Sequence, residues 1–188
     1  MGRWKPDARS RLEKAALALY SEHGFAQTTV AEIAERAGLT ERTFFRYFAD
    51  KREVLFSGAD ALRKQLVTAL AEAPSPLSPI DAVGSAVEAS AGLFGQRRDF
   101  SRKRQAVIAE NAELQERERI KLASLASALA EGLRRRGVGE PAASLAAEMG
   151  IAVLRIAFER WNESKDNGSL AQMMRESFNE LKLVTAGK

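Results

Sequence analysis

Two arginines four residues apart, Arg42 and Arg46, are the residues of this sequence best suited to a specific chemical task. This spacing puts both side chains on one face of a helix, because an α-helix turns by about 100° per residue. A guanidinium group can donate two parallel hydrogen bonds to a guanine edge or pair with a phosphate. The spacing therefore indicates a helix that contacts nucleic acid, while the plainer interpretation is a pair of solvated surface charges.

The residues around the arginine pair fit a short helix with one buried and one exposed side. Phe44 and Phe48 fall on the side opposite to the arginine pair, where they can pack on neighbouring helices. Thr43 and Phe45 border the arginine pair. This pattern predicts that the arginines face solvent or a groove of DNA.

Thr29 and Lys51 flank this helix in the sequence and are placed for contacts with DNA phosphates. Thr29 precedes a short apolar segment and has Glu32 three residues later, which predicts a capping box at a helix N-terminus. Lys51 falls in the first turn of the next predicted helix. Helix N-termini favour anions, because their first amides have no partner within the helix.

The elements that must position these residues are helices along the whole chain. Apolar residues recur at helical spacing, and runs of residues typical of strands are absent. A three-residue connection containing Gly38 gives the second and third helices the dimensions of a helix-turn-helix motif, at 29–48. The sequence predicts an all-α protein with helices at about 8–23, 30–37, 40–48, 50–73, 80–95, 99–113, 115–136, 141–164 and 169–184.

Composition excludes several classes of protein. The chain has 188 residues, a formal net charge of +4, no Cys and one His. Without Cys it has no disulfides or thiolate zinc fingers, and one His excludes a His-cluster metal site, so we expect no metal and no cofactor. No apolar stretch approaches the roughly 18 residues of a membrane span, and residues 1–11 lack the apolar segment of a secretory signal. We therefore expect a cytoplasmic protein without a membrane partner.

The sequence resembles the TetR (tetracycline repressor) family of bacterial regulators over residues 8–58. The resemblance is carried by the runs GFAQTTVAEIA at 24–34, AGLT at 37–40 and TFFRYF at 43–48, together with Lys51. It implies a nine-helix, two-domain homodimer with a DNA-binding domain at 1–56 and an effector-binding and dimerisation domain at 57–188. The TFFRYF form is similar to a group common in actinobacteria.

The resemblance also implies which residues contact DNA. Thr29, Tyr47 and Lys51 would contact mainly phosphates, whereas Arg42, Thr43 and Arg46 would face base edges. Family members often have Tyr at the position of Phe45, so we expect an apolar contact with a thymine methyl there in place of a hydrogen bond to phosphate. The full set implied is Thr29, Thr40, Glu41, Arg42, Thr43, Phe45, Arg46, Tyr47 and Lys51.

Apolar stripes on the last two predicted helices indicate a dimer interface. Two such helices from each of two copies would form a four-helix bundle, as the family implies, and two-fold symmetry would match a palindromic operator. The alternative is a monomeric core in which these stripes pack internally. The expected interface residues are Leu145, Met149, Val153, Ile156, Met173, Met174, Phe178 and Leu181.

A further apolar set could line a pocket for a hydrophobic or amphipathic effector, or could simply form core. The set is Phe94, Val107, Leu122, Leu125, Leu154, Phe158 and Trp161. The run 97–104 carries five cations and one anion, which suits either the mouth of a site for an anionic ligand or a solvated helix start.

These observations predict a sequence-specific DNA-binding transcriptional regulator. We expect a repressor that a small effector releases from its operator, with double-stranded DNA and a second copy of the chain as its other partners. A dimeric DNA-binding protein without an effector is the first alternative. A helical enzyme is the second, and we predict no catalytic residues, because the sequence has no Gly-rich phosphate loop, metal-ligand cluster or nucleophile motif.

Overall fold

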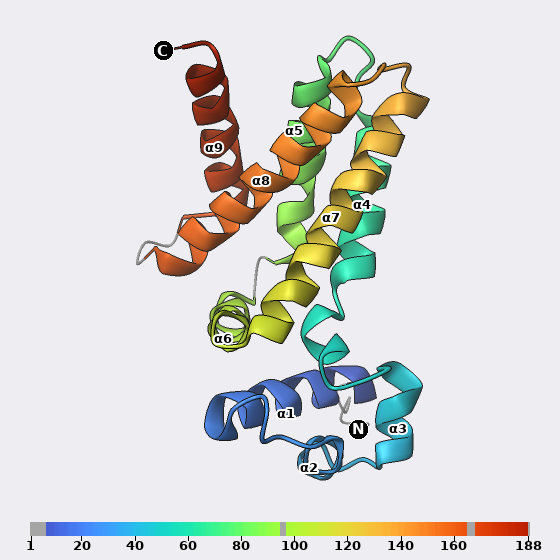
Figure 1. The fold of residues 1–188 in the computed structure, drawn as a ribbon, viewed down its shortest axis with the longest axis vertical. Coiled ribbons are helices and arrows are strands. Elements are labelled where there is room, and N and C mark those ends of the chain that lie inside the picture. The colour runs from blue at the N-terminus through green and yellow to red at the C-terminus, as the bar shows by residue number, and fades with distance from the viewer. Residues whose placement is uncertain (1–6, 95–96, 165–167, 188) are drawn as a thin grey trace, which may run out of the picture. The chain divides into compact units, whose positions relative to one another are not determined.

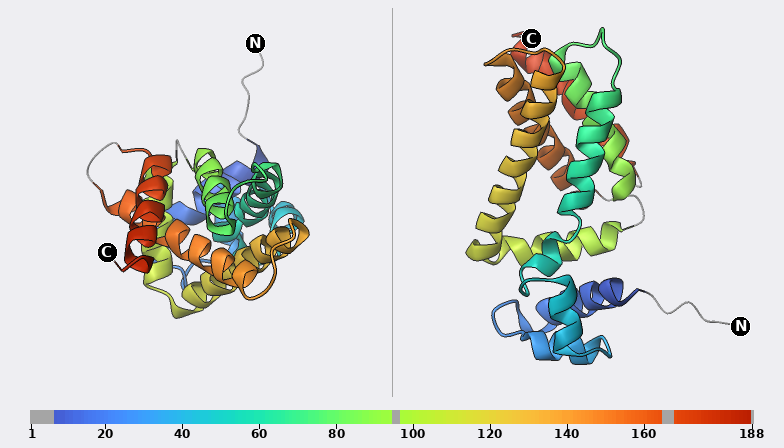
Figure 2. Two further views of the ribbon diagram at one scale, coloured as in Figure 1. Left: turned by 90° about the horizontal axis from the view of Figure 1, so that it is seen from above. Right: turned by 90° about the vertical axis from the view of Figure 1, so that its right-hand side faces the viewer.

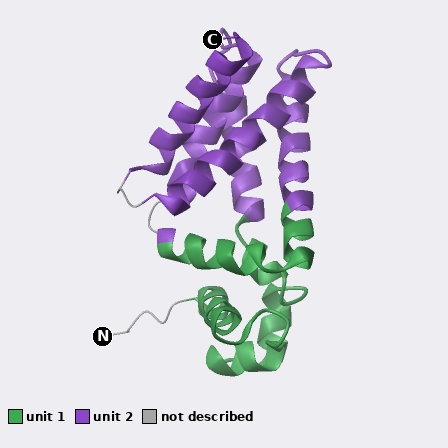
Figure 3. Ribbon diagram, turned by 60° about the vertical axis from the view of Figure 1, so that its left-hand side comes forward, with its two compact units in different colours: residues 1–58, 99–118 green, residues 59–98, 119–188 purple. Residues whose placement is uncertain are grey.

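The computed structural model describes residues 7–94, 97–164 and 168–187, and within these ranges it contains helices and no strands (Figure 1). This confirms the all-α prediction, with nine α-helices in the described residues. The chain forms two compact units, coloured separately in Figure 3. The first comprises residues 1–58 and 99–118, and the second comprises residues 59–98 and 119–188. No helix in the described ranges is long and apolar enough to cross a membrane.

The first unit is a three-helix head closed by a pair of helices from later in the chain. Its core is built around Leu12, Ile33 and Phe44, and the later helices contribute Ile108 and Leu114, all of them almost fully buried. Its elements are α1 (Ala8–His23), α2 (Val30–Arg36), α3 (Glu41–Tyr47), the 3₁₀ helix η1 (Glu53–Phe56), α6 (Arg98–Ala109) from residue 99, and the start of α7 (Ala112–Arg135).

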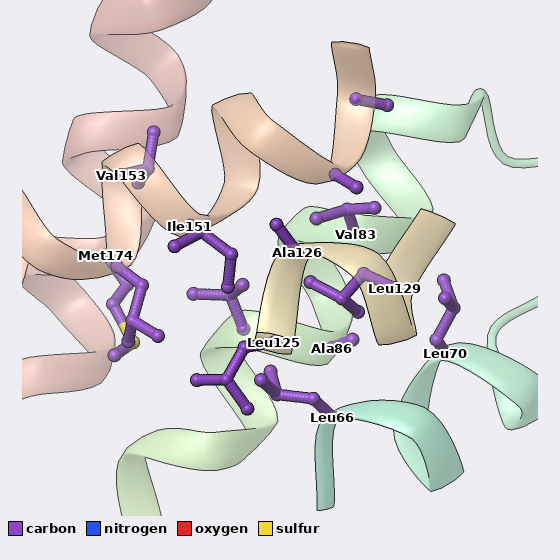
Figure 4. Packing of buried hydrophobic residues seen from close by; sticks show 14 of the residues in the cluster. Leu66, Leu70, Val83, Ala86, Leu125, Ala126, Leu129, Ile151, Val153 and Met174 are labelled. Carbon is purple, nitrogen blue, oxygen red and sulfur yellow. The ribbon is translucent and has the colours of Figure 1, made fainter. Parts of the chain in front are cut away.

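The second unit is a helical body in which α5 packs against α4, α8 and α9. The views in Figures 1 and 2 agree that α8 and α9 are neighbours. Figure 4 shows Leu66 and Leu70 of α4 in one apolar cluster with side chains of α5, α7 and α8. The elements are α4 (Ala59–Glu72), α5 (Pro79–Ser90), the 3₁₀ helix η2 (Ala91–Leu93), α7 from residue 119, α8 (Ala142–Glu163) and α9 (Leu170–Thr185).

The single helix predicted over 50–73 is wrong in its first part. Residues Glu53–Phe56 form a 3₁₀ turn, and α4 begins only at Ala59. The cause is packing, because the consecutive residues Val54, Leu55 and Phe56 are all buried in the core of the first unit. The break falls at Ser57 and Gly58, which form a turn, and Gly is about 1 kcal/mol less favourable than Ala within a helix.

The predicted division of the chain also differs from the packing units. The boundary expected at 56/57 lies close to the observed one at 58/59, but residues 99–118 pack with the head. They do so because Val107, Ile108 and Leu114 belong to the same apolar cluster as the helix-turn-helix core. The head therefore includes residues 99–118, which no pattern in the sequence assigns to it.

Candidate nucleic-acid interface

The third helix has one buried and one exposed side, as its sequence pattern predicts. Phe44 and Phe48 are buried in the core of the first unit, while Arg42 and Arg46 are exposed. Phe45 is 56% exposed, although it makes an edge-to-face contact with Phe44 at a centroid distance of 5.5 Å. The helix therefore presents two cations and one apolar ring together on its exposed side.

Local caps fix the starts of α2 and α3. Thr29 and Glu32 form the predicted capping box: the Thr29 hydroxyl accepts from the Glu32 amide, and Glu32 Oε2 accepts from the Thr29 amide and hydroxyl, both at 2.7 Å. These hydrogen bonds hold the pKa of Glu32 below its ordinary value. Thr40 caps α3 by accepting from the amide of Thr43 at 3.2 Å. The Thr29 hydroxyl thus already uses its one donor within the protein.

The turn between α2 and α3 is held by an arginine from α1. Arg11 donates hydrogen bonds to the carbonyls of Ala37 and Gly38. Gly38 has φ of 64°, a conformation that glycine adopts without steric strain. The angle between the two helices of the motif is therefore fixed both by the backbone and by a side chain from outside the motif.

Most cations in the described part of the head bind partners inside the protein, whereas Arg42 of α3 does not. Arg36 pairs with Glu22, and Arg52 pairs with Asp50 and Glu113. Arg9 and Arg11 donate to backbone carbonyls. Arg42 makes no hydrogen bond or ion pair within the described residues. The same is true of Lys14, an exposed cation of α1. The cation at Arg42 is therefore available to an external anion or base edge.

Arg46 and Tyr47 form a pair on the surface of α3. The Arg46 guanidinium donates to the Tyr47 hydroxyl at 3.2 Å and lies 5.0 Å from the centre of its ring. The tyrosine hydroxyl keeps its own proton for another acceptor. The pair limits the conformations of Arg46 while leaving most of its donors unused.

Lys51, for which the family resemblance implies a phosphate contact, is hydrogen-bonded within the head. Its ammonium group donates to the carbonyls of Phe25, Ala26 and Thr28 at 2.9, 3.2 and 2.8 Å. It also lies 4.6 Å from the centre of the Phe25 ring. The side chain is directed into the turn between α1 and α2.

The sequence patterns did not identify the residues that fasten η1 to α6 and α7. Arg104 donates from Nε to the Leu55 carbonyl at 2.6 Å and pairs with Glu118 at 3.1 Å, and burial lowers its pKa. Arg117 pairs with Glu53 at 2.6 Å. The contact between Arg104 and Leu55 spans 49 residues, so no local spacing could have revealed it.

The predicted effector-pocket residues do not all come together. Val107 lies in the core of the first unit, whereas the other six lie in the body, in or against its core. Phe94, Phe158 and Trp161 form a ring cluster with centroid distances of 5.2 and 5.8 Å. Arg98 donates to the Trp161 and Ser164 carbonyls at the end of α8, so this cation of the run 97–104 serves as a helix cap.

A shallow open groove of about 280 Å³ lies between α7 and α8 of the body. Of the predicted pocket residues it includes only Leu122. Its charged lining residues are Arg119, Glu148 and Arg155.

The predicted dimer residues divide into two groups. Leu145, Met149 and Ile156 are exposed on α8, by 55%, 36% and 42%. Val153, Met174 and Phe178 are buried in the core of the body, and Met173 and Leu181 are half-buried against it. The apolar stripe of α9 thus packs largely within its own protomer, which leaves α8 with the exposed apolar stripe.

Two family profiles match the chain. Residues 12–57 match the bacterial regulatory proteins of the tetR family, and residues 77–185 match the MftR C-terminal domain. The second match covers more than half of the chain.

Two curated relatives carry names of transcriptional regulators. The regulator TcmR of Streptomyces glaucescens is 37% identical over 48% of this chain and 39% of its own length. The regulator MftR of Mycobacterium tuberculosis, named for mycofactocin biosynthesis, is 27% identical over 86% of this chain and 83% of its own length. The chain thus spans well under half of TcmR but most of MftR. Both agree with the predicted similarity to actinobacterial members.

Solved structures share the fold. A TetR-family protein from Syntrophomonas wolfei superposes with a TM-score of 0.68 at 17% identity, over 96% of this chain and 95% of its own. FadR of Bacillus subtilis, solved in complex with stearoyl-CoA, gives a TM-score of 0.61 at 18% identity, over 92% and 96%. At these identities the similarity shows the fold alone.

Proposed function

The chain belongs to the tetR family of bacterial transcriptional regulators, and on this premise we propose that it is a repressor whose head reads a palindromic operator. The observation that carries the proposal is the state of the α3 cations. Arg42 has no internal partner among the described residues, and Arg46 is held only by Tyr47. Arginines presented in this way on a short helix suit guanine edges in the major groove. The proposal places the protein in the cytoplasm, with the DNA.

DNA binding is tested with a duplex selected from a random library by the wild-type protein. Arg42→Ala and Arg46→Ala should each lower affinity for this duplex by about 1–3 kcal/mol and relax the base preference at one position. Lys14→Ala, which removes an exposed cation from α1, should leave the base preference unchanged. A loss from Arg42→Ala that is equal on every duplex would contradict its assignment as a base-reading residue.

We propose further that the repressor is a homodimer joined through the exposed stripe of α8. Leu145 and Ile156 are placed symmetrically about a point between residues 150 and 151, and so are Met149 and Ala152. In an antiparallel pair of α8 helices with a two-fold axis at this point, Leu145 would face the partner's Ile156. Met149, a long side chain, would lie over the partner's Ala152, a short one. The exposed apolar side chains would then leave water.

Charges beside the stripe support the same arrangement. Glu148 and Arg155 lie on one flank of the stripe and are nearly symmetric about the same point. The two-fold axis would therefore bring each Glu148 near the partner's Arg155. Arg155 now pairs with Glu159 of its own helix at 3.1 Å, an exposed pair of small energetic value that can exchange partners.

The proposed effector is a hydrophobic or amphipathic small molecule that binds in the body. The ring cluster of Phe94, Phe158 and Trp161 supports this class of ligand, and FadR of similar fold was solved with stearoyl-CoA. Stearoyl-CoA added to the protein–DNA complex tests the class directly. Release of the duplex supports regulation by an acyl chain, whereas unchanged occupancy favours the dimeric DNA-binding protein without this effector.

A further inference from the structure

Lys51 joins three segments of the head at one point. Its ammonium group donates to the carbonyls of Phe25, Ala26 and Thr28. Its own backbone carbonyl accepts from the hydroxyl of Tyr20 at 2.6 Å. Tyr20 lies in α1, the three carbonyls lie in the turn that follows α1, and Lys51 follows α3. The contact is therefore tertiary, across 23 to 31 residues of chain.

The ammonium group has no donor left for DNA. A lysine has three N–H donors, and three carbonyl oxygens lie between 2.8 and 3.2 Å from Nζ. The ring of Phe25 adds a cation–π contact at 4.6 Å, and Tyr20 packs edge-to-face on the same ring at 5.2 Å. A hydrogen bond from Nζ to a phosphate would require one of these internal bonds to break.

The turn held by Lys51 leads directly into α2. Gly24 begins the turn with φ of 84°, and Thr28 is buried, with its hydroxyl donating to the Gly24 carbonyl at 2.9 Å. The next residue, Thr29, is the N-cap of α2. Three carbonyl dipoles that converge on one point repel each other unless a cation lies among them. The ammonium group therefore holds the turn that leads to the capped start of α2, and with it the orientation of the helix-turn-helix motif.

We propose that Lys51 is a positioning residue, which acts on DNA binding by holding the 25–28 turn and not by contacting phosphate. This inference rests on the proposed function, since it concerns the same DNA-binding head. It departs from the role that the family resemblance implies for this lysine.

A charge-conserving substitution separates the two roles. Arginine binds phosphate at least as well as lysine, but its planar donors cannot surround one point among three carbonyls. Lys51→Arg should therefore weaken binding to the selected duplex by on the order of tenfold, similar to Lys51→Met. For Lys51→Arg the slope of log affinity against log salt should remain close to that of the wild type. A phosphate ligand would instead keep its affinity in Lys51→Arg and lose about 0.9 from that slope in Lys51→Met.

Two further measurements protect the test against misfolding. Tyr20→Phe removes the hydroxyl that holds the Lys51 carbonyl without changing any charge, and it should weaken binding severalfold at an unchanged salt slope. Hydrogen exchange of the free protein should show faster amide exchange at 25–29 in Lys51→Arg and Tyr20→Phe. Lys14→Met, which removes an exposed lysine of α1, should leave this exchange as in the wild type.

The positioning role of Lys51 and the proposed function can fail separately in these experiments. Normal affinity of Lys51→Arg, with unchanged exchange at 25–29, would overturn the positioning role. A wild-type protein that selects no duplex would refute the proposed function. In that case the exchange measurement still determines whether Lys51 holds the turn, because it requires no DNA.

Discussion

At the scale of single residues, the close approach of the α8 backbone to a side chain of α5 makes one position especially sensitive to substitution. Gly150 of α8 lies against Val83 of α5, and a Cβ at this position would overlap Cγ1 of Val83. Val83 is fully buried and β-branched, so it has little freedom to move aside. Gly84 of α5 has more space than Gly150. A Cβ at Gly84 would lie 3.5 Å from the Phe178 ring, which is an ordinary contact.

These two glycines make a matched pair of predictions. Gly150→Ala should destabilise the protein by about 1–3 kcal/mol, the usual cost of overpacking, partly offset by the higher helix propensity of alanine. Gly84→Ala should be neutral or stabilise by up to about 1 kcal/mol. Urea unfolding measures both. Equal effects of the two substitutions would show that the packing of α8 on α5 is looser than described.

Some contacts of single residues could be predicted from the sequence, and others could not. Thr29 with Glu32 could be recognised from the sequence, because a capping box is a local pattern whose donors and acceptors lie three residues apart. Lys51 and Arg104 could not be placed, because their acceptors are backbone carbonyls far away in the sequence. Every residue has a carbonyl, so the identity of an amino acid does not indicate which carbonyl a cation will find.

At the scale of elements, the start of α2 depends on an ionised carboxylate. The pKa of Glu32 is lowered in the folded protein by its hydrogen bonds with Thr29. Its stabilising contribution is therefore complete above the unfolded pKa of about 4.5 and is lost as pH falls through the lower folded value. The pKa of Asp50 is also lowered, mainly by its hydrogen bond with Arg52, so its stabilising contribution is likewise lost as pH falls.

We predict that Glu32→Ala lowers the melting temperature at neutral pH and that this difference narrows below about pH 4. Glu32→Gln can still close the capping box as a neutral group. Its melting temperature at neutral pH should lie between those of the wild type and Glu32→Ala, and it should lose less stability than the wild type on acidification. Thermal unfolding followed by circular dichroism across the acid range measures this. Glu35→Gln on the same helix is the control, and an equal pH dependence in all four proteins would contradict the prediction.

Elements also set the limit of prediction for helix boundaries. The start of α3 could be predicted, because Thr40 and Gly38 mark it locally. The break between η1 and α4 could not be predicted, because Asp50 and Glu53 have the spacing of a capping box, which favours a helix that begins here. These local signals also do not show that Val54, Leu55 and Phe56 are buried together in a core completed by residues 99–118.

At the scale of the whole molecule, the proposed dimer makes a charge-exchange prediction. Glu148→Arg and Arg155→Glu should each weaken dimerisation, because each places like charges across the proposed interface. The double variant should restore most of the affinity. Sedimentation velocity over a range of protein concentrations measures the dissociation constant, and we expect single-variant losses of about tenfold.

The control for this prediction is Glu72→Arg, the same charge change on an exposed residue of α4. It should leave the dimer unchanged. A double variant no tighter than the two single variants would refute the pairing of Glu148 with the partner's Arg155. If Leu145→Asp dimerised as tightly as the wild type, the result would contradict the proposal that α8 forms the interface.

The exposed ring of Phe45 has a consequence for the thermodynamics of operator binding. The unbound head keeps an apolar side chain in water, 56% exposed, beside two arginines. A complex that covers this ring removes apolar surface from water, which lowers the heat capacity. Counterion release, by contrast, weakens as salt rises. The part of the affinity that comes from Phe45 should therefore persist at salt concentrations where the contribution of Arg42 and Arg46 has declined, and dehydration as well as charge would then hold the proposed operator.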